Sequence, residues 1–364
     1  MFNDKIKNQL QRLYLSNFIS NISIAGAAWV LLLVNDGYSL IQVGIAETVF
    51  HAVSLSFEIP SGVIADTIGR KKSLLMSSFA ALMSAVVRGF LPGFGFVLLS
   101  IAFSALSYNF ASGSDSALAY DSLLEEKREN EYDRYISNQT VIYRISNGIA
   151  TLAAGLAVIL GNTKAQIISI GLTLINILIL SGLKENLVIT MKKNVSLSKR
   201  FKDTYRGAFR FLKGNTRVAG LIFRNALVGA VDVLLLFFMQ AKLPMTGIPE
   251  WSLGPLLFIM SLGGILGAKL SSGSGRYSLK KLFFICITIA LSGLLTEFTG
   301  IWYLMTLGGF LTSFADDLLQ IRSDIELNSM VPAEQRATLI SVNSFCFSVV
   351  MIFMSPLAGW IFSL

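Results

Sequence analysis

Several charged side chains and the single histidine of this chain lie inside long apolar segments, where such groups are costly and can do chemistry. Glu47, His51 and Glu58 share one face of a helix because they are spaced by four and seven residues. Glu47 and His51, one turn apart, are placed to share a proton, and histidine titrates in the physiological pH range. The alternative for His51 is a hydrogen-bonded packing residue. Glu58 directly precedes the Ile59-Pro60 end of the segment, and we assign it to the adjoining loop rather than to a pocket.

Asp115 and Arg144 are a second candidate group. They lie in consecutive apolar segments, each about 10 Å from the same end at 1.5 Å per helical residue. The matching depth predicts an ion pair. The pair either only secures packing or opens when a proton or a ligand arrives.

The second half of the chain repeats this pattern. Asp232 lies deep in an apolar segment that also contains Arg224, and Asp316 and Asp317 lie in a later one. Asp232 is the best candidate for a carboxylate at mid-depth, and Arg224 is expected to pair with Asp316 or Asp317. The alternative is a satisfied structural network without a functional role.

Other kinds of site have little support in the sequence. Cys286 and Cys346 both lie in apolar runs, so neither a disulfide framework nor a thiolate metal site is expected. A single histidine provides neither a histidine metal cluster nor a nucleophile–base pair at motif spacing. We therefore expect no metal, no cofactor and no enzymatic activity.

The composition indicates the elements that must position these residues. Of the 364 residues, 53% are hydrophobic and 14% are charged, whereas soluble domains contain about 25% charged residues. This balance predicts an all-α polytopic membrane protein and argues against a soluble enzyme, a fibrous protein or a disordered chain.

Apolar segments of spanning length recur along the whole chain. Eleven are expected, at 13–34, 39–60, 73–91, 94–120, 135–160, 164–183, 217–240, 251–270, 281–299, 301–326 and 335–361. A twelfth is absent or truncated. Small residues such as Gly263, Gly264 and Gly267 should let neighbouring helices approach closely.

The distribution of Lys and Arg predicts the orientation. With the N-terminus in the cytoplasm, Arg88, Lys164 and Lys242 alone fall outside, and the other basic clusters fall inside. The predicted location is therefore the cytoplasmic membrane, with multiple passes. The net charge of +8 is then explained by membrane lipid as a partner, without nucleic acid.

One long polar connection divides the chain. We predict a six-helix bundle at 1–183, a basic linker at 184–216 and a second bundle of five spans at 217–364. Apolar residues recur at helical spacing between 197 and 212, which predicts an amphipathic helix, either on the inner membrane surface or packed on the bundle ends.

The loop between the second and third spans carries a recognisable motif. It contains Gly62, Asp66, Gly69, Arg70 and Lys71 at the spacing G-x-x-x-D-x-x-G-R-[RK]-[RK]. This resembles the signature loop of the major facilitator superfamily. The resemblance implies two pseudo-symmetric helical bundles and a conformational-switch motif made of these residues and Glu58.

Further segments are similar to the same family. The end of the fourth span, Tyr120-Asp121-Ser122-Leu123, resembles a YDSL-like end common in one bacterial branch, and 331–338 resembles the entry to the eleventh span. Residues 267–276 look like a degenerate copy of the signature loop. Two features depart from the family pattern: Asn109 replaces an arginine of the fourth span, and 148–155 lacks the proline of the antiporter motif.

The resemblance and the embedded charges together predict a secondary transporter. Embedded acids outnumber embedded bases, which favours a neutral or cationic substrate. We expect a monomer that moves a small organic, amphipathic molecule by alternating access, as proton-coupled efflux. The alternatives are a proton-linked transporter of a polar metabolite and a non-transporting membrane sensor with the same fold.

Overall fold

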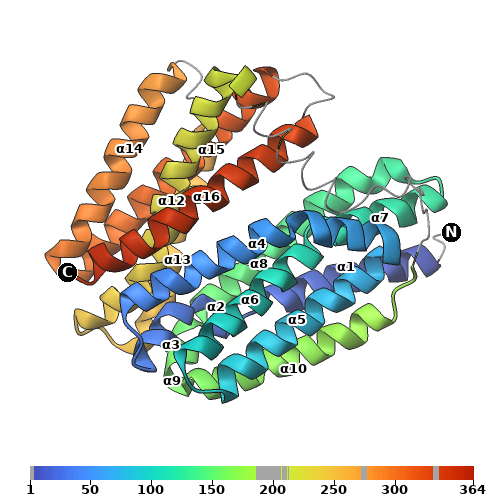
Figure 1. Cartoon of the computed structure of the whole chain (residues 1–364), viewed down its shortest axis with the longest axis horizontal. Coiled ribbons are helices and arrows are strands. Elements are labelled where there is room, and N and C mark those ends of the chain that lie inside the picture. The colour runs from blue at the N-terminus through green and yellow to red at the C-terminus, as the bar shows by residue number, and fades with distance from the viewer. Residues whose placement is uncertain (1–3, 186–205, 207–210, 212, 272–276, 331–335) are drawn as a thin grey trace. The chain divides into compact units, whose positions relative to one another are not determined.

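The computed structural model describes residues 4–185, 206, 211, 213–271, 277–330 and 336–364, and these form helices without any strand (Figure 1). The helices of the first half are α1 (Asp4–Asn21), α2 (Ile24–Ala27), α3 (Trp29–Asn35), α4 (Leu40–Ile68), α5 (Arg70–Phe90), α6 (Phe94–Ala111), α7 (Ser114–Glu125), α8 (Tyr132–Leu152), α9 (Ala154–Leu160) and α10 (Asn162–Ser181). Those of the second half are α12 (Thr216–Met245), α13 (Leu253–Ser271), α14 (Leu279–Leu295), α15 (Trp302–Met330) and α16 (Arg336–Phe362). Short 3-10 turns are Glu129–Glu131, Glu250–Ser252 and Thr296–Thr299.

The all-α polytopic architecture is confirmed, but the number of eleven spans is not. Eight helices of the described part are long and apolar enough to cross a membrane, or nine if the bent pair α8–α9 is one span. The expected first span is divided among α1, α2 and α3. The expected tenth span, in α15, contains several acidic residues and Arg322.

Two other expected spans are interrupted. The fourth is divided into α6 and α7 at Gly113, whose φ of +72° is a left-handed conformation that glycine adopts without strain. The fifth bends by 43° between α8 and α9. The sequence pattern marked these segments as apolar but did not indicate the breaks.

The chain forms two compact units: Met1–Leu32 with Ala52–Arg200, and Leu33–His51 with Phe201–Leu364. In the first unit α5 packs against both α6 and α10. In the second unit α15 packs against α12, α13 and α14. The first part of α4 also belongs to this unit and lies against α16. The predicted boundaries at 183 and 217 remain a prediction, and most of the expected amphipathic helix lies outside the described residues.

The close approach of helices expected at the glycines of α13 is present. A side chain at Gly263 would overlap the carbonyl of Phe310 in α15, and one at Gly267 would overlap that of Phe314. α13 therefore lies against the backbone of α15, and this contact fixes the helix that carries Asp316 and Asp317.

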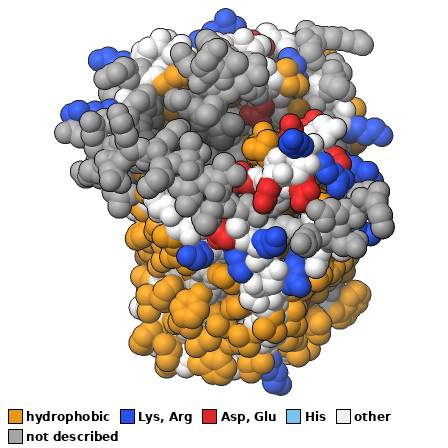
Figure 2. Space-filling model, turned by 90° about the vertical axis from the view of Figure 1, so that its right-hand side faces the viewer, with side chains coloured by type: hydrophobic (Ala, Val, Ile, Leu, Met, Phe, Trp, Pro, Cys, Tyr) orange, Lys and Arg blue, Asp and Glu red, His pale blue; other side chains and the backbone are white. Residues whose placement is uncertain are grey.

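Apolar side chains gather on the outside of the molecule. Figure 2 shows a face on which they form a broad band, with Lys, Arg, Asp and Glu side chains collected beyond one edge of it. α10 is an extreme case, because only 17% of its spanning window is buried. An apolar outer surface of this kind is suited to hydrocarbon and not to water.

Candidate functional site

The signature loop is built around the start of α5. Gly69 has a φ of +110° and stands directly before the helix. The carboxylate of Glu185 accepts hydrogen bonds from the backbone N–H groups of Lys71 (3.1 Å) and Lys72 (3.2 Å). A side chain at Gly69 would overlap that carboxylate. Glycine is thus required here for two reasons: the turn has a positive φ, and a side chain would displace the Glu185 carboxylate that caps the helix.

The basic residues of the loop have definite partners. Arg70 Nη1 lies 3.3 Å from Asp121 Oδ2, an acid of the YDSL-like segment. Lys71 Nζ donates to the carbonyl of Ser181 at 2.7 Å, at the end of α10. Arg70 thus pairs with an acid of the neighbouring helix α7. The loop therefore connects α5 to both α7 and α10.

The part of the motif within α4 is different. Glu58 and Asp66 are exposed. No described atom lies within 4 Å of a Cβ built on Gly62, so the described part shows no close helix contact at this glycine. The resemblance also implies that Asp66 faces the entry to the eleventh span, and residues 331–335 of that entry lie outside the described residues.

Glu47 and His51 form the pair that their spacing predicts. His51 Nε2 lies 3.2 Å from Glu47 Oε1, and both side chains are buried. The rings of Phe50 and Phe347 meet the imidazole edge to face at 5.4 and 5.7 Å. The imidazole therefore lies between an acid of its own helix and two aromatic rings.

Asp115 and Arg144 do not form the expected ion pair. Asp115 Oδ1 accepts from the N–H of Ser116 at 2.6 Å, and its Oδ2 accepts from Gln139 Nε2 at 3.3 Å. The Gln139 amide also donates to Tyr135 Oη at 2.6 Å. Arg144 is exposed. The prediction used depth alone and was wrong, because two residues at the same depth can have side chains on different faces of their helices.

Asn109, at the position where the resemblance places arginine, takes a structural role. Its amide donates to the carbonyl of Ser54 at 2.7 Å, and its Oδ1 accepts from the hydroxyl of Ser54 at 2.8 Å. This reciprocal pair joins α6 to α4 and satisfies a buried amide.

The acids of the second half form one cluster. Asp232 in α12 is buried, and its Oδ1 accepts from the hydroxyl of Ser313 in α15 at 2.6 Å. Asp316 Oδ1 lies 3.3 Å from a Cβ built on Gly229, and the Asp317 carboxylate lies against Gly264. Asp316 is close enough to feel the charges of both Asp232 and Asp317. Three carboxyl groups therefore lie where α12, α13 and α15 come together.

Arg224 does not neutralise this cluster. Its guanidinium lies over the ring of Phe283 in α14, 5.7 Å from the centroid, and its buried Nε has no hydrogen-bond partner among the described residues. The expected pair of Arg224 with Asp316 or Asp317 is thus a wrong prediction. A cation over an aromatic face is stabilised by the ring quadrupole instead.

Sequence reasoning missed a buried ion pair at the other end of the second unit. Lys242 Nζ lies 3.3 Å from Glu297 Oε1, and the Glu297 side chain is only 1% exposed. Glu297 follows a spanning segment and resembles an ordinary loop acid. The proximity of Lys242 has no signal in the sequence, because 54 residues separate the two.

The described residues hold no group of three or more His, Cys, Asp and Glu side chains arranged to bind a metal ion.

Comparisons with known proteins agree with this architecture. The sequence model of the Major Facilitator Superfamily matches residues 13–281. The chain belongs to this superfamily.

Individual relatives are distant. An uncharacterised transporter of the same type from Bacillus subtilis (strain 168), YxaM, is 32% identical over 93 residues, which are 26% of this chain and 23% of the relative. The match thus spans about a quarter of the length of that curated protein.

Solved structures share the fold over nearly the whole chain. The nucleoside transporter NupG has a TM-score of 0.76 at 15% identity, with 97% of this chain and 91% of that one covered. A bacterial homologue of the lysosomal transporter Spinster has a TM-score of 0.71 at 16% identity, covering 98% and 82%. A D-xylose–proton symporter has 0.63 at 11% identity, covering 100% and 94%.

Proposed function

We propose that this protein is a proton-linked secondary transporter of a small polar organic molecule that is neutral or cationic. The observation that carries the proposal is the acid cluster of Asp232, Asp316 and Asp317, where α15 packs against the two candidate spans α12 and α13 and Ser313 donates to Asp232. A charged carboxylate within the membrane costs several kcal/mol, about 2.5–3.5 on insertion scales. Such a cluster persists where it serves a function, as the coupling acids of transporters do.

The composition of the cluster supports the class of substrate. It contains three carboxyl groups and the hydroxyl of Ser313, and Arg224 lies over the ring of Phe283. Carboxylates accept hydrogen bonds from hydroxyl, amino and ammonium groups and repel anions. The proteins of similar fold named above include a nucleoside transporter and a sugar–proton symporter, and molecules of those kinds are rich in hydroxyl groups.

The same carboxyl groups support the proposal of proton coupling. Three nearby carboxylates repel one another. A proton or a cation bound to one of them reduces this repulsion and so stabilises the cluster. Substrate and proton can then compete for Asp232. Glu47 with His51 offers a second group that can hold a proton.

A second candidate function is proton-coupled efflux of an amphipathic cation. It is favoured by the same excess of acids and by Phe347, whose ring lies 3.5 Å from a Cβ built on Gly229 beside Asp316. The two candidates differ in whether hydroxyl-rich neutral molecules or lipophilic cations are moved.

The test is flux into proteoliposomes, with and without an imposed pH gradient. The panel contains a labelled nucleoside, a pentose, a hexose and a fluorescent lipophilic cation. We expect gradient-stimulated flux of a polar solute in the wild type and at least tenfold lower stimulated flux in Asp232→Asn. Glu326→Gln on α15, whose side chain lies 3.8 Å from the exposed Arg217, is the matched control and should retain flux.

The flux and binding results distinguish the proposed function from its alternatives. Flux of the cation alone establishes the second candidate. Flux that ignores the gradient rejects proton coupling, and binding of a panel member without any flux rejects transport in favour of a sensor. In the same assay Asp66→Asn should retain binding and lose flux, because we assign the signature loop to conformational switching; loss of binding there contradicts that assignment.

A further inference from the structure

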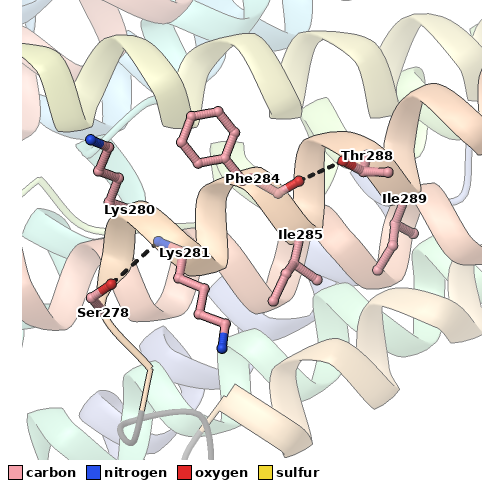
Figure 3. A pocket seen from close by; sticks show the side chains of 7 residues that line it. All are labelled: Ser278, Lys280, Lys281, Phe284, Ile285, Thr288 and Ile289. Carbon is pink, nitrogen blue, oxygen red and sulfur yellow. Dashed lines mark hydrogen bonds between the residues drawn. The ribbon is translucent and has the colours of Figure 1, made fainter.

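A groove runs along the outward face of α14, away from the acid cluster. It encloses about 670 Å³, and its described lining residues run from Ser278 to Ile289 (Figure 3). α14 is a candidate membrane span, and only 28% of its spanning window is buried. The groove therefore opens toward the surroundings of the protein and not into the second unit.

The beginning of the groove is positively charged. Lys280 and Lys281 are both exposed and both line it. The hydroxyl of Ser278 accepts from the N–H of Lys281 at 3.4 Å, so the groove starts at a capped helix N-terminus. Lys281 Nζ lies 5.1 Å from the centre of the Tyr277 ring, which holds the ammonium group near the helix end. No acidic residue belongs to the described lining.

The rest of the groove is apolar for two further turns. Phe284 is 57% exposed and Ile285 is 39% exposed. The hydroxyl of Thr288 donates to the carbonyl of Phe284 at 2.7 Å, so its hydrogen bond is made within the helix (Figure 3). From Lys281 to Ile289 this surface extends for about 12 Å along the helix axis.

We propose that this groove binds one anionic glycerophospholipid of the cytoplasmic leaflet. The phosphate binds at the helix N-terminus, where Lys280 and Lys281 extend to either side of α14 and make the surface positive, and an acyl chain lies over Phe284, Ile285 and Ile289. Charge complementarity selects an anionic head group. A free phosphate ion would use only the lysines and leave the adjoining apolar surface uncovered.

The position of the groove fits the inner leaflet. The Lys and Arg distribution assigns the start of α14 to the cytoplasmic end, where the membrane surface is negative. Lipid binding there does not depend on the transport that we propose for the protein, so each can fail without the other.

The experiment is native mass spectrometry of the full chain in detergent, titrated with dioleoyl-phosphatidylglycerol, dioleoyl-phosphatidylcholine or inorganic phosphate. We expect saturable binding of one phosphatidylglycerol and weaker binding of phosphatidylcholine. K280Q/K281Q should weaken phosphatidylglycerol binding about 25-fold, at roughly fivefold per lysine near a membrane surface. The control K7Q/K127Q removes two other exposed lysines and should change it less than twofold.

A second variant tests the apolar part. I285S/I289S should weaken binding of dioleoyl-phosphatidylglycerol while phosphate remains without effect, and its melting temperature in detergent reports whether it is folded. Equal binding of both lipids, an equal loss in K7Q/K127Q, or displacement of the lipid by millimolar phosphate overturns the proposal.

Discussion

At the scale of single residues, several charged side chains of this protein have neutral partners instead of an opposite charge. Asp115 is held by Gln139 and Ser116 and not by an arginine, and Arg224 rests on an aromatic ring. Glu185 caps α5 through two backbone N–H groups. A buried charge needs hydrogen bonds or an ion pair, and neutral amides and backbone groups supply these as well as opposite charges do.

The partners of Asp115 can be tested by double-mutant cycles on the free energy of unfolding. Asp115→Ala and Gln139→Ala should be coupled by about 0.5–3 kcal/mol, because they share a hydrogen bond. Asp115→Ala and Arg144→Ala should be additive within about 0.5 kcal/mol. Coupling to Arg144 that exceeds coupling to Gln139 restores the ion pair that the sequence suggested.

Sequence reasoning found the residues whose partners lie at a fixed spacing in the same segment, and it missed those whose partners lie on other helices. The signature loop is recognisable because a turn needing glycine, an acid and two cations stand at fixed spacing. The pair Glu47–His51 is recognisable because both partners lie on one helix. Glu185 and Gln139 were missed because their partners come from other helices, and an acid after a span or a glutamine within one resembles ordinary sequence.

At the scale of the elements, glycines decide which helices can meet. In α13 they let the helix lie on the backbone of α15, and in α14 Gly293 would collide with Gly308 and Thr312 if it had a side chain. The sequence predicted close approach from small residues, but not which helix approaches. α15 receives both contacts, so the helix with two of the three clustered acids has little freedom to move within its unit.

Filling one of these contacts should destabilise the second unit. Gly263→Val places a side chain where the carbonyl of Phe310 lies, and overpacking costs about 1–3 kcal/mol. The thermal unfolding midpoint in detergent should fall. Gly171→Val in α10 is the matched control, because no described atom lies within 4 Å of its Cβ, and it should change stability by less than about 0.5 kcal/mol. An equal fall in both variants removes the packing explanation.

At the scale of the whole molecule, the sequence predicted the class of fold well and the details of the spans less well. A majority of apolar residues with spanning periodicity leaves few architectures for a membrane chain, because backbone groups must be satisfied within helices. Breaks such as those at Gly113 and between α8 and α9 depend on local backbone conformation. A hydropathy average over a window of residues does not detect such breaks.

The orientation of the whole chain remains a prediction, and it determines the leaflet of the groove on α14. We expect Lys7 inside and Lys164 outside, because cytoplasmic segments carry the excess of Lys and Arg. Both side chains are exposed. Each is replaced by cysteine in a Cys286→Ala/Cys346→Ala background, and intact cells are treated with a membrane-impermeant maleimide.

Lys164→Cys should then react in intact cells, whereas Lys7→Cys should react only after the membrane is opened. Cys286 is buried and Cys346 is partly buried, so alanine at these positions removes background thiols with little surface change. Reaction of Lys7→Cys in intact cells reverses the orientation. The lysines at the start of α14 would then face the outer leaflet, and the buried pair of Lys242 and Glu297 would lie at the cytoplasmic end.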